Sequence, residues 1–121
     1  MSKDMVVYEY VNCGTCKKAL AFLSKHNIPY TKKPIRETPP TEKELGQMLK
    51  EVKEVRRLFN TSGKDYREMN LKEKIPKMDT PEILKLLASN GNLIKRPFVI
   101  GEKVNLVGFD EIEWKLKLRI K

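Results

Sequence analysis

Hydrophobic residues first gather at positions 5–11, where β-branched and aromatic side chains surround a single charged residue, Glu9. This composition is typical of a strand that is buried on both faces. Beyond this run, the apolar positions follow the spacing of one helix face, at Cys16, Ala19, Leu20 and Leu23. The pattern therefore predicts a strand followed closely by a helix.

The first helix should end near residues 25–27, because Pro29 disfavours helical geometry at the residue before it. Residues 30–35 then predict a second short strand. A strand, a helix and a strand at this spacing form a βαβ unit, in which the strands run parallel and the crossover is right-handed.

The next part of the chain, residues 38–93, favours helices. Thr41 to Glu44 has the composition of a capping box. Helical spacing continues beyond it at Leu45, Met48, Leu49, Val52 and Phe59. A short helix is indicated near residues 69–71, and a longer one begins at Thr80, a cap residue followed by proline. Asn90-Gly91 should end that longer helix.

Two short apolar runs, residues 96–100 and 103–107, flank a glycine turn and predict a β-hairpin. The tail that follows gives two conflicting signals. Asp110 to Glu113 resembles another capping box, with the aspartate as the cap. From 112 to 120, however, apolar and charged residues alternate, and this periodicity alone predicts a strand.

Length and charge narrow the class of protein. The 121 residues suit one domain covering positions 1–121. Lys and Arg number 25 against 16 Asp and Glu, a net charge of +9 that would suit nucleic acid or an acidic partner. The basic residues are scattered without interleaved aromatic ones, which favours a solvated basic surface and no direct binding of nucleic acid. We expect a monomer.

The sequence contains no apolar stretch of membrane-spanning length. Its first residues also lack the basic start and apolar run of a signal peptide. We therefore expect a cytoplasmic protein, in which cysteines stay reduced and a C-x-x-C pair is more often active than structural.

Both cysteines, Cys13 and Cys16, lie where the strand pattern changes to the helix pattern. Cys13 falls in the turn before the helix, near its unpaired N–H groups, and Cys16 lies one turn further on the packing face. The positive end of the helix and the neighbouring Lys17 and Lys18 would stabilise a thiolate at Cys13. These positions make Cys13 the candidate attacking thiol and Cys16 the candidate resolving thiol.

Two alternatives to redox chemistry remain open. The cysteines could be inert thiols, or they could form half of a zinc site. Zinc normally needs four ligands, and apart from the pair the chain offers no cysteine and only one histidine, His26. We therefore expect no metal.

Four short motifs occur in order along the chain: Cys13-Gly14-Thr15-Cys16, Asn90-Gly91, Arg96-Pro97-Phe98 and Val107-Gly108-Phe109-Asp110-Glu111. Their order and separation resemble the arsenate reductase (ArsC)/Spx family of thioredoxin-fold proteins. The resemblance implies an α/β fold, a thioredoxin-like four-stranded mixed sheet with a helical insertion, at about 38–93, between the βαβ unit and the C-terminal hairpin. It also implies a cis peptide bond at Pro97 and a helix from position 110 onward.

The resemblance assigns roles to six residues. Arg96 would lie near the active cysteine, where it binds an oxyanion or stabilises a thiolate, and it joins Cys13 and Cys16 as a catalytic residue. Gly14, Thr15 and Pro97 would line the substrate site. No bound cofactor is implied, and an external thiol, glutathione or thioredoxin, would serve as the reductant.

The chain departs from the family at two places. Arsenate reductases of this type carry two further arginines, but the corresponding stretches here, residues 59–63 and 104–107, contain none. A dianion such as arsenate calls for several charge-assisted donors, so this loss argues against arsenate as the substrate. Spx proteins use a glycine-containing acidic loop to contact the C-terminal domain of the RNA polymerase α-subunit, and the nearest segment here, residues 50–55, has no glycine.

Three functions are therefore compatible with the sequence. The first is a thiol–disulfide oxidoreductase that uses Cys13 and Cys16 on a disulfide or thiol substrate, small molecule or protein. The second is a redox-switched transcriptional regulator of the Spx type, which binds RNA polymerase. The third is a structural domain with an idle motif. The complete dithiol motif favours the first.

Overall fold

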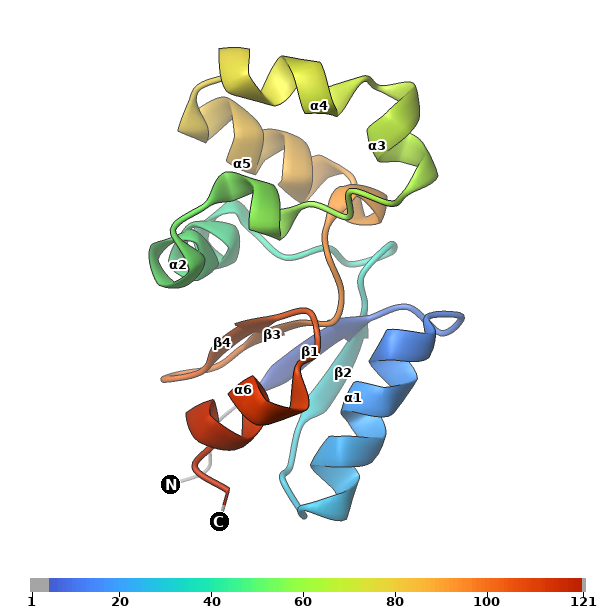
Figure 1. Ribbon diagram of the computed structural model, residues 1–121, viewed down its shortest axis with the longest axis vertical. Helices are drawn as coiled ribbons and strands as arrows, with labels where there is room; N and C mark the ends of the chain where they lie inside the picture. Colours follow the sequence, from blue (N-terminus) through green and yellow to red (C-terminus); the bar gives the residue numbers. More distant parts are fainter. Residues whose placement is uncertain (1–4, 121) are drawn as a thin grey trace.

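A computed structural model describes residues 5–120 of the chain. The elements follow the order β1 (Val6–Glu9), α1 (Gly14–Lys25), β2 (Thr31–Pro34), α2 (Glu42–Val52), η1 (Val55–Leu58), α3 (Lys64–Glu68), α4 (Leu71–Lys74), η2 (Ile75–Lys77), α5 (Thr80–Ser89), η3 (Gly91–Leu93), β3 (Phe98–Ile100), β4 (Asn105–Val107) and α6 (Glu111–Lys117), where η denotes a 3-10 helix. Figure 1 shows a sheet with helices on both sides.

The four strands form one mixed sheet in the order β2-β1-β3-β4. β1 and β2 are parallel, with Val6 opposite Thr31, as the predicted βαβ unit requires. β3 runs antiparallel to β1, with Phe98 opposite Tyr8, and β3 and β4 form the predicted hairpin. The predicted thioredoxin-like sheet, with its helical insertion between the βαβ unit and the hairpin, is confirmed.

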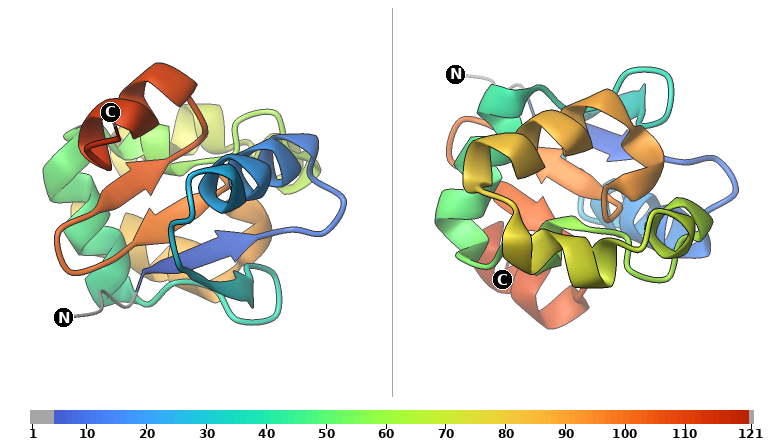
Figure 2. Two further views of the ribbon diagram at one scale, coloured as in Figure 1. Left: turned by 90° about the horizontal axis from the view of Figure 1, so that it is seen from below. Right: turned by 90° about the horizontal axis from the view of Figure 1, so that it is seen from above.

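Each face of the sheet is covered by helices from a different part of the chain. α1 and α6 lie on one face, and the insertion from α2 to α5 lies on the other (Figures 1 and 2). Since side chains alternate along a strand, Val7, Val99 and Leu106 pack on the first side, in a cluster with Phe22 and Trp114.

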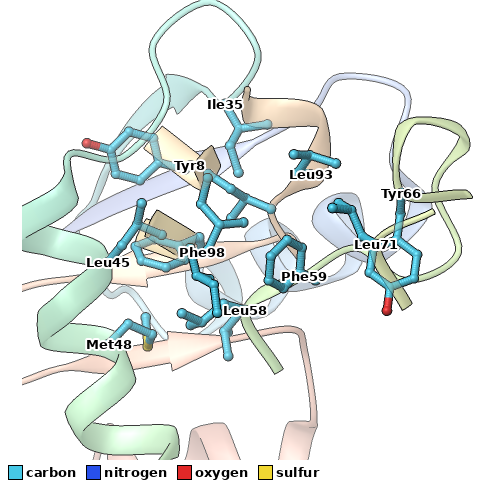
Figure 3. Close-up of a cluster of buried hydrophobic side chains, with 14 of the residues drawn as sticks. Tyr8, Ile35, Leu45, Met48, Leu58, Phe59, Tyr66, Leu71, Leu93 and Phe98 are labelled. Atoms are coloured by element: carbon cyan, nitrogen blue, oxygen red, sulfur yellow. The ribbon is translucent and has the colours of Figure 1, made fainter. Parts of the chain in front are cut away.

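The opposite face builds the larger hydrophobic cluster. Tyr8 and Phe98 from the sheet meet Leu45 and Met48 of α2 and Phe59 after η1 (Figure 3). The Tyr8 and Phe98 rings meet edge to face at 6.0 Å between centroids. This cluster fixes the insertion on the sheet, and the end of β1 and the start of β3 are thereby held at one edge beside it.

The helical insertion begins as predicted but differs in detail. Thr41 and Glu44 form the predicted capping box of α2, which ends at Val52, because Lys53 takes a left-handed conformation with φ of 68°. The helix therefore does not reach Phe59. α5 is capped by Asp79 rather than by Thr80, whose predicted role as cap was wrong. The short α3 was not predicted, and the helix expected near residues 69–71 is α4.

The strand predicted from the alternating tail was wrong, and the helix implied by the family resemblance is found. The Asp110 side chain accepts a hydrogen bond from the backbone N–H of Glu113 and starts α6. Trp114 is fully buried, and its indole N–H donates to the carbonyl of Gly108 at 3.1 Å. An ion pair between Lys117 and Glu51 joins α6 to α2.

The first strand is shorter than the predicted run 5–11, since β1 ends at Glu9 and the chain turns before Cys13. Over residues 5–120, none of the helices has the length and apolar character needed to cross a membrane. The cytoplasmic location stays a prediction.

Candidate active site

Cys13 is the N-cap residue of α1. Its backbone is extended, with φ of −93° and ψ of 114°, and its Sγ accepts a hydrogen bond from the backbone N–H of Cys16 at 3.2 Å. Its own N–H donates to the carbonyl of Tyr10 at 3.0 Å, which ties the turn to the end of β1. The sulfur thus occupies the place of a capping oxygen at the positive end of the helix.

The two sulfurs differ in access to solvent. Both thiols are free, Cys13 is half-buried, and Cys16 is fully buried in the first turn of α1. A reagent in solution therefore reaches Cys13 first. Cys16 lies directly behind it, three residues along the same helix start.

The surroundings favour the thiolate form of Cys13. Partial burial raises the pKa of the Cys13 thiol, but hydrogen bonds from the Cys16 thiol and backbone N–H, together with the hydrogen bond and charge of Arg96, outweigh that effect and lower it. The nucleophile is the thiolate, so a lowered pKa increases the reactive fraction near neutral pH.

Cys16 is affected in the opposite direction. Burial, followed by the hydrogen bond with Cys13, raises the pKa of the Cys16 thiol to about 12. A thiol that keeps its proton serves as the donor to its neighbour's thiolate. The two cysteines are therefore chemically distinct in the direction that the sequence predicts.

Arg96 is a cation that acts on Cys13 from a distant part of the chain. Lys17 and Lys18 are both exposed on α1, while the charge and hydrogen bond that lower the pKa of Cys13 come from Arg96. The effect of the helix end is carried by the Cys16 N–H. The predicted contribution of the two lysines stays a prediction.

Arg96 reaches the site from the turn that precedes β3. The predicted cis peptide bond between Arg96 and Pro97 is confirmed, and Pro97 is buried. The Pro97 carbonyl accepts from the N–H of Gly108 at 2.9 Å. The Arg96 side chain is half-buried, and its Cζ lies 5.0 Å from the centroid of the Tyr10 ring, a cation–π arrangement.

Gly14 and Thr15, which the family resemblance assigns to the substrate site, form the exposed first turn of α1 beside Cys13. A Cβ built on Gly14 would meet nothing within 4 Å. The space beside the Gly14 Cα is therefore open. The roles of both residues stay predictions.

The structure describes both stretches in which the arginines of the arsenate reductases are missing. Asn60, in the first of these stretches, lines the same pocket as Arg96 and carries a neutral amide. In the hairpin, Leu106 and Val107 are buried in the core on the two faces of the sheet. Neither position brings a second cation to Cys13.

Two residues that the sequence analysis did not single out belong to this region. Tyr10 follows β1 and Arg36 follows β2, and the Arg36 Nη1 donates to the Tyr10 hydroxyl at 3.0 Å. The signal was available, because neighbouring parallel strands end at the same edge of a sheet. A tyrosine and an arginine just beyond two such ends are expected to meet.

The zinc alternative finds no support in the geometry. His26 caps the far end of α1, away from Cys13 at its start, and its ring lies 4.6 Å from that of Phe22. A helix of this length spans roughly 18 Å, so the three residues do not form one ligand set. Within the described part of the chain, no group of three or more His, Cys, Asp or Glu residues is arranged to hold a metal ion.

Comparison with known sequences agrees with this fold and site. The sequence model of the ArsC family matches residues 8–116. The chain belongs to the ArsC family. The match includes both cysteines and the Arg96-Pro97 turn.

The chain is similar to an ArsC-family structure, to a Bacillus protein and to an Spx regulator. Protein YusI of Bacillus subtilis is 45% identical over 114 residues, covering 93% of this chain and 96% of YusI. The global transcriptional regulator Spx of Staphylococcus saprophyticus is 31% identical over 103 residues, covering 84% of this chain and 77% of Spx. The structure of an ArsC family related protein from Bacteroides fragilis is 40% identical, covers 97% of this chain and 98% of that chain, and superposes with a TM-score of 0.86.

Membership of the ArsC family, with Spx regulators among the relatives, supports a thiol redox function for this protein. The unequal pair of thiols at the start of α1 agrees with such a function.

Proposed function

We propose that this protein is a small thiol–disulfide oxidoreductase in which Cys13 attacks and Cys16 resolves. One observation carries the proposal: the half-buried Cys13 sulfur accepts the Cys16 N–H at 3.2 Å, directly above a buried Cys16 thiol. A lowered pKa at one thiol and a raised pKa at the other match the two roles.

In the first step, the Cys13 thiolate attacks one sulfur of a substrate disulfide. A bond forms between Cys13 and that sulfur, the substrate S–S bond breaks, and the other half leaves as a thiolate that takes a proton from water. Arg96 holds the attacking thiolate through its charge and hydrogen bond.

In the second step, the Cys16 thiol loses its proton and attacks the Cys13 sulfur. The Cys13–Cys16 disulfide forms, the bond between Cys13 and the substrate sulfur breaks, and the second half leaves as a thiolate that takes up the proton lost by Cys16. Two electrons have passed from the dithiol to the substrate, which is now two thiols. An external thiol reductant then returns the protein disulfide to the dithiol.

This reaction fits the site better than arsenate reduction does. Arsenate is a dianion and calls for several charge-assisted donors, whereas Arg96 is the cation that acts on Cys13, and Asn60, Leu106 and Val107 stand in the stretches where further arginines are expected. A disulfide carries no charge at the reacting sulfur atoms, so it makes no such demand.

Mild oxidation tests whether the two thiols act as a pair. One equivalent of diamide should convert the reduced protein into a monomer with a Cys13–Cys16 disulfide, because the C-x-x-C spacing at a helix start brings the two sulfurs within bonding reach. Mass spectrometry should find the loss of two hydrogens, and dithiothreitol should restore the original mass. The Cys16→Ser variant, which keeps Cys13, should instead give intermolecular dimers or diamide adducts. If the wild-type protein also yields mainly dimers, Cys16 is not the resolving thiol.

A second candidate is a redox-switched transcriptional regulator, which is supported by the 31% identity to Spx of Staphylococcus saprophyticus. In such a protein the same disulfide would change the affinity for the C-terminal domain of the RNA polymerase α-subunit. Repeated turnover of a small disulfide with a thiol reductant and no protein partner favours the oxidoreductase. Binding of the purified polymerase domain by only one redox form, without such turnover, favours the regulator.

A further inference from the structure

A polar pocket opens beside the candidate active site, where β1 and β2 end beneath the helical insertion. Its volume is about 360 Å³, enough for a group the size of an amino acid. Its lining includes Tyr10, Arg36, Asn60, Lys64, Asp65 and Arg96. Three of these six residues are cations and one is an anion, so the pocket is electropositive.

Two guanidinium groups share one aromatic ring in this pocket. The Cζ of Arg36 lies 5.1 Å and that of Arg96 lies 5.0 Å from the centroid of the Tyr10 ring. Over residues 5–120, neither arginine forms an ion pair with a carboxylate. Two positive groups are thus held near each other by an aromatic ring without a direct ion pair. Arg36 donates to the Tyr10 hydroxyl through Nη1, and its other N–H donors remain available to an anion.

The backbone at Arg36 is fixed by its neighbours, although the Arg36 side chain is exposed. The N–H of Ile35, the preceding residue, donates to the carbonyl of Glu9 at 2.9 Å, and Ile35 itself is fully buried. Gly91 packs so closely that a Cβ there would lie 1.8 Å from the Ile35 carbonyl oxygen and 3.0 Å from the Arg36 Cα. The end of β2 and its arginine are therefore fixed against η3.

The one carboxylate in the pocket is engaged first by neutral donors, because hydrogen bonds from Asn90 and Asn92 are the largest causes that lower the pKa of Asp65, ahead of the charges of Lys64 and Arg36. Asp65 accepts hydrogen bonds from the side-chain amides of Asn90 at 3.1 Å and Asn92 at 3.3 Å. Arg36 thus remains the exposed guanidinium at the pocket, with Lys64 beside it. The Lys64 Nζ lies 3.9 Å from the Glu68 Oε2 in a solvent-exposed ion pair, and such a pair holds the ammonium only weakly.

The pocket is connected to the nucleophile through two residues. The Tyr10 carbonyl accepts the N–H of Cys13 at 3.0 Å, and Arg96 belongs both to the pocket lining and to the surroundings of the Cys13 thiol. A ligand with its sulfur at Cys13 would therefore extend over Tyr10 toward Arg36.

We propose that Arg36, assisted by Lys64, binds a carboxylate of the substrate, so that Cys13 reacts preferentially with small disulfides that carry a carboxylate group. The proposal rests on the proposed oxidoreductase function and adds the substrate class. A carboxylate matches the planar fork of the Arg36 guanidinium, which offers two parallel donors. The chemistry is the two-step exchange described above: one carboxylate-bearing disulfide becomes two thiols, and the Cys13–Cys16 dithiol becomes a disulfide.

Three disulfides of similar size and different charge test this proposal. They are 3,3′-dithiodipropionate, which is anionic, bis(2-hydroxyethyl) disulfide, which is neutral, and cystamine, which is cationic. The fully reduced protein is mixed with each, the reaction is quenched with acid, and the oxidised fraction is followed by mass spectrometry. Each rate is divided by the rate of the same disulfide with free 2-mercaptoethanol, which removes differences in intrinsic reactivity.

We expect the wild-type protein to favour the anionic disulfide over the neutral one by roughly 5- to 20-fold, since one charge-assisted contact has about that value. Arg36→Ala should lose most of this preference and keep its rate with the neutral disulfide. Arg57→Ala, which removes the same charge from an exposed position in η1, should behave as the wild type. Arg36→Lys should keep part of the preference, because it keeps the charge without the planar fork.

The outcomes separate the two proposals. Equal normalised rates with all three disulfides, or an equal loss of preference in Arg36→Ala and Arg57→Ala, would overturn the carboxylate subsite while leaving the oxidoreductase function intact. Failure of the wild-type protein to react with any of the three would instead overturn the oxidoreductase function. A preference that persists in Arg36→Ala and disappears in Lys64→Ala would assign the carboxylate to Lys64 and overturn the role of Arg36.

Discussion

Replacing Cys13 by serine is expected to abolish disulfide reduction, with a loss of more than about a thousandfold in turnover. A serine hydroxyl keeps its proton at neutral pH and is a poor nucleophile toward sulfur, and the buried Cys16 cannot take over. Turnover is measured with a small disulfide and a coupled thiol reductant. Circular dichroism on the same sample checks the fold, which should be retained because serine is also a good N-cap residue.

The matched variant, Cys16→Ser, should fail in a different way. Cys13 still attacks, so one equivalent of substrate thiol is released, but the resolving step is lost and the mixed disulfide remains. Mass spectrometry should find the protein with half of the substrate bound at Cys13. Reduction of the disulfide by Cys13→Ser at the rate of the wild-type protein, or a Cys13 that carries no substrate in Cys16→Ser, would contradict the assigned roles.

The largest effect on stability is expected for Gly91→Ala. A Cβ at this position would lie 1.8 Å from the backbone oxygen of Ile35, and the atoms that it would meet belong to the backbone and not to a flexible side chain that could move aside. We expect the free energy of unfolding to fall by about 3 kcal/mol or more. Unfolding in urea, followed by Trp114 fluorescence, measures it.

Gly14→Ala is the control for this prediction. A Cβ at Gly14 meets no atom within 4 Å, and alanine favours the helical conformation that Gly14 adopts in the first turn of α1. The free energy of unfolding should therefore stay constant or rise by up to about 1 kcal/mol. Equal stabilities of Gly91→Ala and the wild type would mean that β2 and η3 do not approach each other as described.

The sequence predicts most elements of this fold because local signals agree with the tertiary context. The run at positions 5–11 and the helical spacing after Cys16 lead to β1 and α1. Thr41 and Glu44 act as the capping box that their spacing indicates. The glycine turn between the last two strands gives the hairpin. In each case, side-chain chemistry within a few residues determines the backbone.

The tail shows where periodicity misleads. When every second residue is apolar, residues four positions apart are apolar too, and such residues lie on the same face of a helix. The alternating pattern is therefore also compatible with a helix that carries two rows of apolar side chains. Trp114 and Leu118 form the inner row, which packs on the core, while Ile112 and Leu116 remain exposed on the outer one. The local signal for a helix was the spacing of opposite charges four residues apart, such as Glu111 and Lys115. In the structure the Lys115 Nζ lies 3.6 Å from the Glu111 Oε2.

The candidate site was only partly predictable, because some of its residues are neighbours in the sequence and others come from distant segments. The C-x-x-C spacing and the helix start fix the relation of Cys13 to Cys16 within one turn. Arg96 comes from a distant turn, and its approach was implied only by the family resemblance. Tyr10 and Arg36 come together because two parallel strands end at one edge, which requires the strand pairing to be known.

The central claim is that Cys13 is an activated thiolate supported by Arg96, and the pH dependence of its alkylation tests this most directly. The rate with iodoacetamide follows the thiolate fraction, so a lowered pKa moves the inflection to lower pH. We expect an inflection for Cys13 below the ~8.5 of a free thiol, an inflection at higher pH in Arg96→Ala, where the positive charge is gone, and no change in Arg57→Ala. Peptide mapping should assign the label to Cys13 and not to Cys16. An inflection at or above ~8.5 in the wild-type protein, or the same profile in wild type and Arg96→Ala, would contradict the claim.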